Sequence, residues 1–582
     1  MDIHFLGGAT TVTGSRFLLT TSRARVLIDC GMFQGSPNES VRNRIPLGFD
    51  PEALDAILLT HAHLDHCGLL PVAVREGYHG PIHATAGTIE LATLVLLDSG
   101  RLHEEFAKRE ARWERRHPDK VAADDRREQD AYQAAVDQAA VGEARPTTDG
   151  GRVPAAGLTP ETAGAAVDEA AAVETESSTA TATAAVRPVG ANGNGSTLEQ
   201  FPTRVEPTGR PPFDPEATLR AQPPELIIDL DAPLYTEDDA KEVLPLFRPV
   251  RYGTEFEVAP GIHATYLDAG HILGSAIIRL RVRDREDGDE RVVVFSGDLG
   301  RPGTPIVRDP TPLDRADYVV MESTYGGREH EPHDEAIRIL AETVRLVAEA
   351  DGVLLVPSFA IGRTQEIVWE LDRLIERGEI PLLPLYLDSP MASKASDIYR
   401  RHPEYYDEET RRLLQTEGSP LDYPDQRITN TMRDSQAIAR APRPYMIVAS
   451  NGMLTGGRVV NHLRNLIGDP AATLLFVGYQ GEGTLGAHLQ AGATTVRLDG
   501  QVHQVRCHVR SISGFSAHAD EEELLEWVAH FGAGRRPGGP GFPRRVFLVH
   551  GDPEAQIALE PKVAALGFDA YVPRWHERVT LD

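Results

Sequence analysis

The sequence predicts a mixed α/β fold that is divided into at least two domains. Short β-branched runs separated by Gly, Pro and polar residues fill much of the first hundred residues, which is typical of sheet strands. Beyond Tyr325, strand-like runs alternate with helical patterns, which indicates an α/β layer with a parallel sheet. A length of 582 residues with 41% hydrophobic side chains allows two to four domains and at least one large core.

The predicted elements follow one another along the chain. In the first region we expect strands at residues 3–6, 16–20, 25–29 and 56–60, and then a helix over 86–99. Strand-like runs return at residues 263–269, 276–282, 291–298 and 318–323. The alternating region has a helix near 362–377 and strands at 353–357, 383–388, 445–450 and 473–479. The last elements are a strand at 504–512, a helix over 520–531 and a strand at 545–550.

A long segment between these regions lacks the composition of a core. From Glu104 the sequence becomes rich in charged helix-formers, and it then turns to Ala, Thr, Glu, Gly and Pro as far as Pro224. So few large apolar side chains cannot offset the entropy of ordering the chain, and we therefore expect residues 118–222 to be a disordered, low-complexity insertion. A helical arm over 104–145 is the alternative that its helix-formers allow.

Charge and cysteine content exclude several classes of protein. The 59 Lys and Arg residues against 87 Asp and Glu residues give a net charge of −28, so a polyanionic substrate needs a locally positive site. Only three cysteines are present, which is too few for a disulfide scaffold. No secretory leader and no run of about 18 apolar residues is found. We expect a soluble, cytoplasmic protein without a membrane partner.

A histidine-rich motif follows a predicted buried strand. His61, His63, Asp65 and His66 come directly after the apolar run at 56–60, where α/β sheets expose functional side chains. Imidazole nitrogen and carboxylate oxygen are ligands that suit zinc. The motif therefore predicts a metal-binding loop, and a surface cluster of histidines is the alternative.

Three further residues occupy matching positions. Asp298, His271 and His550 each lie at or near the end of a strand-like run. Singly, they would be explained as a turn residue, a loop cap and a core histidine, but their recurrence at strand ends favours a shared site. Two metal ions roughly 3.5–4 Å apart bind a bridging hydroxide and stabilise in-line displacement at phosphorus.

These motifs resemble the metallo-β-lactamase fold and its β-CASP nucleic-acid-processing branch, in the group of the cleavage-and-polyadenylation endonuclease subunit and its prokaryotic homologues. The matching stretches are residues 7–15, 27–35, 60–71, 233–239, 268–276, 295–301, 322–328, 357–366, 388–392, 449–458, 478–486, 515–520 and 548–552. The resemblance implies an αββα sandwich with an inserted α/β domain. The sandwich would comprise residues 1–117, 223–325 and 496–582, and the β-CASP domain residues 326–495.

The resemblance also implies the ligands of two zinc ions. One ion would be held by His61, His63, His271 and Asp298, and the other by Asp65, His66, His550 and the shared Asp298. Asp29 would orient the metal-binding loop without touching the metal.

The implied catalytic residues are Asp65, Glu322 and His518. His518 would protonate the leaving oxygen while Glu322 orients it, because a leaving alkoxide has a high pKa and needs a proton. The implied function is zinc-dependent hydrolysis of single-stranded RNA by the metal-bridging hydroxide, leaving a 3′-hydroxyl and a 5′-phosphate. Internal cleavage is expected, with 5′ exonuclease activity as a further option.

His550 favours RNA as the substrate, since DNA-processing members of the family carry valine at that position. Two alternatives stay open, namely a small-molecule metallohydrolase acting on thioesters or lactams, and a non-catalytic subunit of an RNA-processing complex. For assembly, a homodimer and an RNA-processing complex are both open.

Gly-rich turns after predicted strands of the second domain are candidate phosphate contacts. Backbone N–H groups in such turns can hold phosphate oxygens, and arginine adds bidentate contacts. Ordinary turns and helix caps explain the same residues. The candidates are Ser358, Arg363, Ser450, Gly452 and Thr484.

Overall fold

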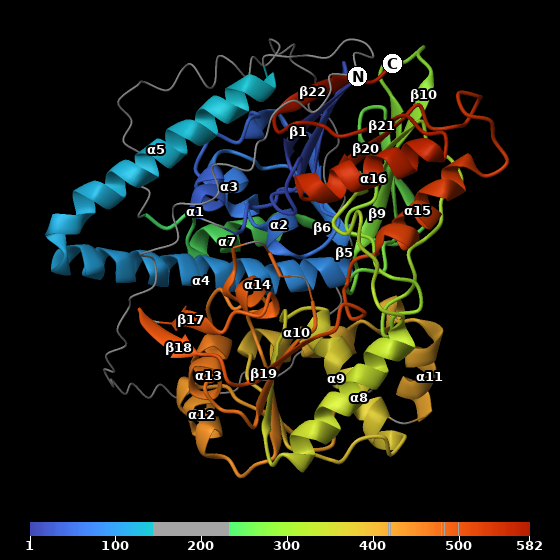
Figure 1. The fold of residues 1–582 in the computed structure, drawn as a ribbon. Helices are drawn as coiled ribbons and strands as arrows, with labels where there is room; N and C mark the ends of the chain where they lie inside the picture. The colour runs from blue at the N-terminus through green and yellow to red at the C-terminus, as the bar shows by residue number, and fades with distance from the viewer. Residues whose placement is uncertain are drawn as a thin grey trace, which may run out of the picture.

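In a computed structural model, the chain forms a two-sheet sandwich and a second α/β domain beneath it, with both termini at the top of the sandwich (Figure 1). The structure describes residues 1–35, 37–143, 232–416, 418, 421–478, 480–481, 483–498 and 500–582. Within these residues, no helix has the length and apolar character needed to cross a membrane.

The sandwich contains two seven-stranded sheets, ordered β22-β1-β2-β3-β4-β5-β6 and β21-β20-β11-β10-β9-β8-β7. The first is built from β1 (Asp2–Gly7), β2 (Arg16–Thr20), β3 (Arg25–Ile28), β4 (Ala56–Leu58), β5 (Ile82–Thr85), β6 (Phe247–Val250) and β22 (Glu577–Thr580). The second is built from β7 (Glu255–Ala259), β8 (Ile262–Asp268), β9 (Ala276–Arg283), β10 (Glu290–Phe295), β11 (Tyr318–Glu322), β20 (Arg545–Val549) and β21 (Ala570–Tyr571).

Helices cover the outer face of each sheet. The first sheet carries α2 (Leu64–Cys67), α3 (Leu70–Arg75), α4 (Ala86–Arg116) and α7 (Glu237–Val243), and the second carries α15 (Glu521–Ala529) and α16 (Pro553–Ala565). Short turns of helix join these elements: α1 (Pro37–Ser40), η1 (Val41–Asn43), η2 (Pro51–Ala53), η3 (Leu244–Leu246) and η6 (His530–Gly532). The expected αββα sandwich is confirmed.

Strands that are buried on both faces hold the layers together. In β3, Val26 and Ile28 point into the core between the two sheets, whereas Leu27 packs among the outer helices. Successive side chains of a strand point to opposite faces, so a strand covered on both sides must be apolar throughout. This is why the apolar run at 25–29 marks a central strand.

The second domain is a six-stranded parallel sheet ordered β14-β13-β15-β12-β16-β19. Its strands are β12 (Val353–Pro357), β13 (Leu385–Leu387), β14 (Gln426–Ile428), β15 (Tyr445–Ala449), β16 (Ala472–Phe476) and β19 (His508–Ser511). α8 (His333–Glu349), α9 (Arg363–Glu376) and α10 (Pro390–Arg401) pack on one face, and α13 (Arg458–Leu466) and α14 (Leu485–Gln490) on the other. The remaining elements are η4 (Pro403–Tyr405), α11 (Glu408–Thr416), α12 (Met432–Ala437), η5 (Ile438–Arg440), β17 (Thr495–Leu498) and β18 (Gln501–Gln504).

The second domain extends further along the chain than the boundary at residue 495 expected from the sequence. β19 pairs in parallel with β16, so residues up to Ser511 belong to the second sheet. Only pairing between strands distant in sequence shows this, and an apolar run such as 504–512 does not identify its partner.

Helix α5 (Pro118–Glu143) corrects the expectation of disorder over 118–222. Ala135 and Ala139, one helical turn apart, pack with Phe33, Ile45 and Trp575 in a small buried cluster. Residues 118–143 therefore form a helix that docks on the sandwich, which agrees with the alternative of a helical arm. Alanine favours helix formation, and alanine methyl groups one turn apart are enough to form a buried apolar stripe along one side of the helix. The rest of the expected insertion, residues 144–222, lies outside the described residues.

Candidate active site

The histidine-rich loop lies where β4 ends. It is fixed to the loop after β3 by backbone hydrogen bonds from Cys30 N to His66 O (2.8 Å) and from Met32 N to Leu64 O (3.0 Å). A Cβ atom on Gly31 would lie 1.6 Å from the carbonyl oxygen of Asp65, so only glycine permits this approach. The two loops therefore form one rigid unit.

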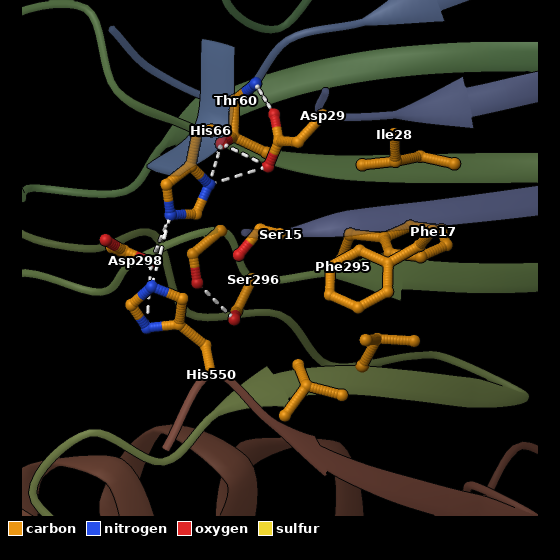
Figure 2. A pocket seen from close by; sticks show the side chains of 13 residues that line it. Ser15, Phe17, Ile28, Asp29, Thr60, His66, Phe295, Ser296, Asp298 and His550 are labelled. Atoms are coloured by element: carbon orange, nitrogen blue, oxygen red, sulfur yellow. Dashed lines mark hydrogen bonds and ion pairs between the residues drawn. The ribbon is translucent and has the colours of Figure 1, made fainter. Parts of the chain in front are cut away.

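Asp29 orients this loop from behind. Its carboxylate accepts hydrogen bonds from Thr60 N, Thr60 Oγ1 and His66 Nδ1, each at 2.8 Å, as Figure 2 shows. In the neutral form of His66 that binds a metal, Nδ1 donates to Asp29, so Nε2 carries the lone pair and faces Asp298. Burial raises the pKa of Asp29, and the neighbouring His66 opposes that rise.

Four residues converge in a first cluster, made of His61, His63, His271 and Asp298. His63 Nδ1 lies 3.2 Å from His61 Nε2 and 3.1 Å from His271 Nε2. Oδ2 of Asp298 lies 3.4 Å from His61 Nε2 and 3.6 Å from His271 Nε2. The other ring nitrogen of His271 is occupied by the carbonyl oxygen of Ala517 at 3.0 Å, which directs Nε2 into the cluster.

A second cluster, made of Asp65, His66 and His550, lies beside the first. Nε2 of His550 is 3.3 Å from His66 Nε2 and 3.7 Å from Asp65 Oδ2. Oδ1 of Asp298 is 3.2 Å from His66 Nε2, so the two oxygens of Asp298 face different clusters. Figure 2 shows His66, His550 and Asp298 turned toward one another at this point.

The donor set fits a zinc ion in the first cluster. Ligands at the usual Zn–N distance in a tetrahedron lie about 3.3 Å from one another, and the four spacings above run from 3.1 to 3.6 Å. Toward the second cluster, Oδ1 of Asp298 is buried without a hydrogen bond from the described residues, which is costly for a carboxylate oxygen unless a cation compensates it.

The charge states of the first cluster also suit a cation. Burial lowers the pKa of His61 to about 3 and that of His63 to about 4, so both rings are neutral at pH 7 and offer lone pairs. Burial opposes ionisation of Asp298, but His550 and His66 beside it hold the pKa of this carboxyl well below its usual range. In the second cluster, burial lowers the pKa of His66, but Asp298 and Asp29 outweigh it and raise this pKa well above its ordinary value, so a metal ion binding there must displace the proton from Nε2.

His518 and Glu322 form a hydrogen-bonded pair at the edge of the clusters. Glu322 ends β11, is fully buried, and accepts from Leu299 N at 2.6 Å and Thr324 Oγ1 at 2.5 Å. Nδ1 of His518 lies 3.1 Å from Glu322 Oε1, and its Nε2 lies 3.9 Å from Asp298 Oδ2. Burial lowers the pKa of His518, but the Glu322 carboxylate outweighs it and raises this pKa to about 9.

The candidate phosphate contacts lie at the carboxyl edge of the second sheet. Ser358 follows β12 and Ser450 follows β15, and Gly452 packs against the ring of Phe359. All four candidates with side chains have local partners. Ser358 Oγ accepts from Thr364 Oγ1 at 3.1 Å, and Ser450 Oγ donates to Ser389 Oγ at 3.0 Å. Arg363 forms a buried ion pair with Glu366, and Thr484 caps α14 through the N–H of Ala487. Contact with phosphate stays a prediction for all five.

Two residues that bind the site residues, Thr60 and Thr324, were not predicted from the sequence. Thr60 contacts Asp29, and Thr324 donates to Glu322 and lies 3.1 Å from His550 Nδ1. Both lie inside motif stretches that were recognised, 60–71 and 322–328, so their position next to His61 and Glu322 is the signal that could have identified them.

An αββα sandwich with a buried cluster of histidines and a shared aspartate at one sheet edge defines a metal-dependent hydrolase of the metallo-β-lactamase class. Three family models match the chain. They are the metallo-beta-lactamase superfamily over residues 10–130, the Beta-Casp domain over 364–489, and the Zn-dependent metallo-hydrolase RNA specificity domain over 502–573.

Curated relatives are similar along the whole chain. The chain is 31% identical over 579 residues to Ribonuclease TTHA0252 of Thermus thermophilus, with 100% of both chains covered. It is 28% identical over 569 residues to Transcription termination factor FttA of Methanosarcina mazei, covering 96% of this chain and 68% of that one. FttA of Pyrococcus horikoshii is 28% identical over 580 residues, at 96% and 67% coverage. The chain belongs to the β-CASP family of the metallo-β-lactamase superfamily, as its motifs indicated.

Proposed function

We propose that the protein is a zinc-dependent ribonuclease that cuts single-stranded RNA and leaves a 3′-hydroxyl and a 5′-phosphate. The observation that carries the proposal is the Glu322–His518 pair, whose outer nitrogen lies 3.9 Å from the aspartate shared by both clusters. A relative named as a ribonuclease along the full chain and a matched RNA specificity domain support the same substrate class.

Two zinc ions are proposed, one for each cluster. His61, His63, His271 and Asp298 would hold one, and Asp65, His66, His550 and Asp298 the other. Bound zinc would supply Lewis acidity, which makes water nucleophilic at neutral pH and offsets charge on the phosphate.

The protein's own residues supply the proton for the leaving group. When the P–O3′ bond breaks, the electron pair stays on the 3′ oxygen, which needs a proton because an alkoxide is a poor leaving group. His518 keeps Nδ1 on Glu322 and therefore presents its second N–H, at Nε2, toward the clusters. Asp65 lies next to His66 in the second cluster. It is the third catalytic residue of the proposal, beside His518 and Glu322.

The second domain is suited to hold the RNA strand. α9 follows β12 on one face of the sheet, whereas α13 follows the neighbouring β15 on the other face. Ligands of open parallel sheets bind at such a switch point, outside the carboxyl ends of the strands. The loop after β12 also touches the sandwich, because a Cβ atom on Gly362 would lie 2.7 Å from Ile272, next to His271.

Internal cleavage is proposed as the main activity, and 5′ exonuclease activity is the further option. The proposed assembly is either a homodimer or an RNA-processing complex. A cytoplasmic location is proposed because all three cysteines are free and buried.

The test combines zinc content with cleavage of a 5′-labelled single-stranded RNA, with and without chelator, for the wild type and Asp65→Ala. We expect chelator-sensitive products from the wild type only, and the product ladder separates internal cuts from progression from the 5′ end. Bound zinc without RNA cleavage would instead favour a small-molecule hydrolase, and absence of zinc a non-catalytic subunit.

A further inference from the structure

Arg301 joins the two loops that carry the catalytic groups. The aspartate loop, residues 298–301, bears Asp298, and the histidine loop, residues 513–520, bears His518. Nη1 of Arg301 donates to the carbonyl oxygen of Gly514 at 2.7 Å. Its Nε donates to the carboxylate of Glu523 on α15, at 3.1 and 3.2 Å. One side chain that is only 9% exposed therefore connects the aspartate loop, the histidine loop and α15.

The histidine loop is held on its other side by Glu331. Oε2 of Glu331 accepts from the backbone N–H groups of Ser513 and Gly514, both at 2.8 Å. The peptide groups of Gly514 are thus fixed at both ends, by Glu331 at N–H and by Arg301 at C=O. A Cβ atom on Gly514 would lie 2.7 Å from the Cβ of Ala336, so the loop also has no room to move toward α8.

The two loops meet again next to the catalytic pair. The N–H of Ala519 donates to the carbonyl oxygen of Leu299 at 2.8 Å, and the N–H of Leu299 donates to Glu322 at 2.6 Å. A shift of the histidine loop against the aspartate loop would therefore move His518 relative to both Asp298 and Glu322. Arg301 is the charged side chain of the aspartate loop that resists this shift, since its guanidinium is paired and buried.

We propose that Arg301 is a positioning residue for proton donation by His518 to the leaving 3′ oxygen. This inference rests on the proposed ribonuclease function and concerns one step of it. Arg301 touches neither cluster, and it acts by keeping the two loops in one relative position. A displacement of about 1 Å at a reacting group can reduce the rate about 100-fold. Loss of Arg301 also leaves the Gly514 carbonyl without its buried donor, and leaves Glu523 with the N–H of Asp520 as its donor.

The test compares two leaving groups in one RNA sequence with a single cleavage site. One substrate has the natural 3′ oxygen, and the other has sulfur there, which leaves as a thiolate and needs no proton. We expect Arg301→Gln to slow cleavage of the oxygen-linked RNA roughly 10–100-fold, the usual effect of removing a supporting partner. The rate for the sulfur-linked RNA and the zinc content should stay near those of the wild type. Arg301→Lys, which keeps the charge, should show a smaller loss of the same kind.

Two comparisons make the outcome specific. His518→Ala should likewise slow cleavage of the oxygen-linked RNA but not of the sulfur-linked RNA. Adding Arg301→Gln to His518→Ala should reduce the cleavage rate little further, because both changes affect one step. Arg510→Gln removes a comparable arginine, bound to Thr343 and Glu342 away from the clusters, and should alter neither rate.

Equal losses on both substrates, or no loss on either, would overturn the role of Arg301. A His518→Ala variant without preference between the substrates would instead refute proton donation by His518, and the inference with it. Failure of the wild type to cut either RNA would refute the ribonuclease proposal itself.

Discussion

Replacing Asp29 by Asn tests whether Asp29 sets the tautomer of His66 that zinc binding requires, with the proton on Nδ1 and Nε2 free. One oxygen of Asp29 accepts the N–H of Thr60, and the other accepts Thr60 Oγ1 and His66 Nδ1, all at 2.8 Å. Asparagine has the same shape but only one oxygen, which must stay on the buried N–H of Thr60. Its NH₂ group then faces His66 Nδ1, which has to accept, so the ring proton moves to Nε2.

Nε2 of His66 is the atom that lies 3.2 Å from Asp298 and 3.3 Å from His550, and a protonated Nε2 cannot bind a cation there. We expect Asp29→Asn to weaken zinc binding at the second cluster roughly 10–100-fold, or about 1.4–2.7 kcal/mol. Zinc binding at the first cluster should be weakened less. Among its residues, only the shared Asp298 contacts Nε2 of His66.

The assay is competition for zinc with a fluorescent chelator, together with metal content and the melting temperature of the metal-free protein. Asp55→Asn is the matched control, because Asp55 is exposed and its carboxylate accepts only the N–H of Arg25 at the start of β3 among the hydrogen bonds described. Zinc affinity in Asp29→Asn equal to that of Asp55→Asn would refute the reasoning about the tautomer of His66.

Three further predictions concern proton transfer, pH and thiol chemistry. His518→Ala should retain zinc but slow RNA cleavage roughly 10²–10⁴-fold, and an unchanged rate would exclude it as the proton donor. Burial lowers the pKa of His576 to about 3, so the unfolded chain takes up the proton first as the pH falls. The stability from this group is complete above about pH 6.5 and declines toward pH 3, by about 2 kcal/mol at pH 5. Urea unfolding of His576→Asn, which suits the positive φ of 61°, should show a smaller loss between pH 7 and pH 5 than the wild type. The thiols of Cys30, Cys67 and Cys507 are buried with raised pKa values, so a disulfide reagent should modify them only after unfolding, and rapid reaction of the native protein would contradict this.

Local sequence patterns were sufficient for the strands that carry the site. β4 is a short apolar run that ends three residues before His61, and β11 is one that ends in Glu322. Side chains at strand ends reach the edge of the sheet. The residue types of the motif then indicate a metal because imidazole and carboxylate suit zinc. For the same reason, the family could be recognised before any tertiary contact was known.

Patterns were insufficient where long-range packing decides. The composition of residues 118–143 is that of a polar segment, yet Ala135 and Ala139 find a buried surface made by Phe33, Ile45 and Trp575. The surface consists of residues from both ends of the chain, so no local window contains it. The boundary beyond residue 495 was likewise set by the pairing of β19 with β16.

The chemical class of the site follows from local sequence, because ligand type and position at strand ends are local properties. Long-range packing makes Asp298 face the two clusters with different oxygens. It also places Nε2 of His518 3.9 Å from Asp298 Oδ2, while Nδ1 of His518 contacts Glu322. These relations join β10, β11 and the segment before α15, whose distances are set by the packing of sheets and loops that are far apart in the chain. The role of Arg301 is of the same kind, because its partners lie more than 200 residues away along the chain.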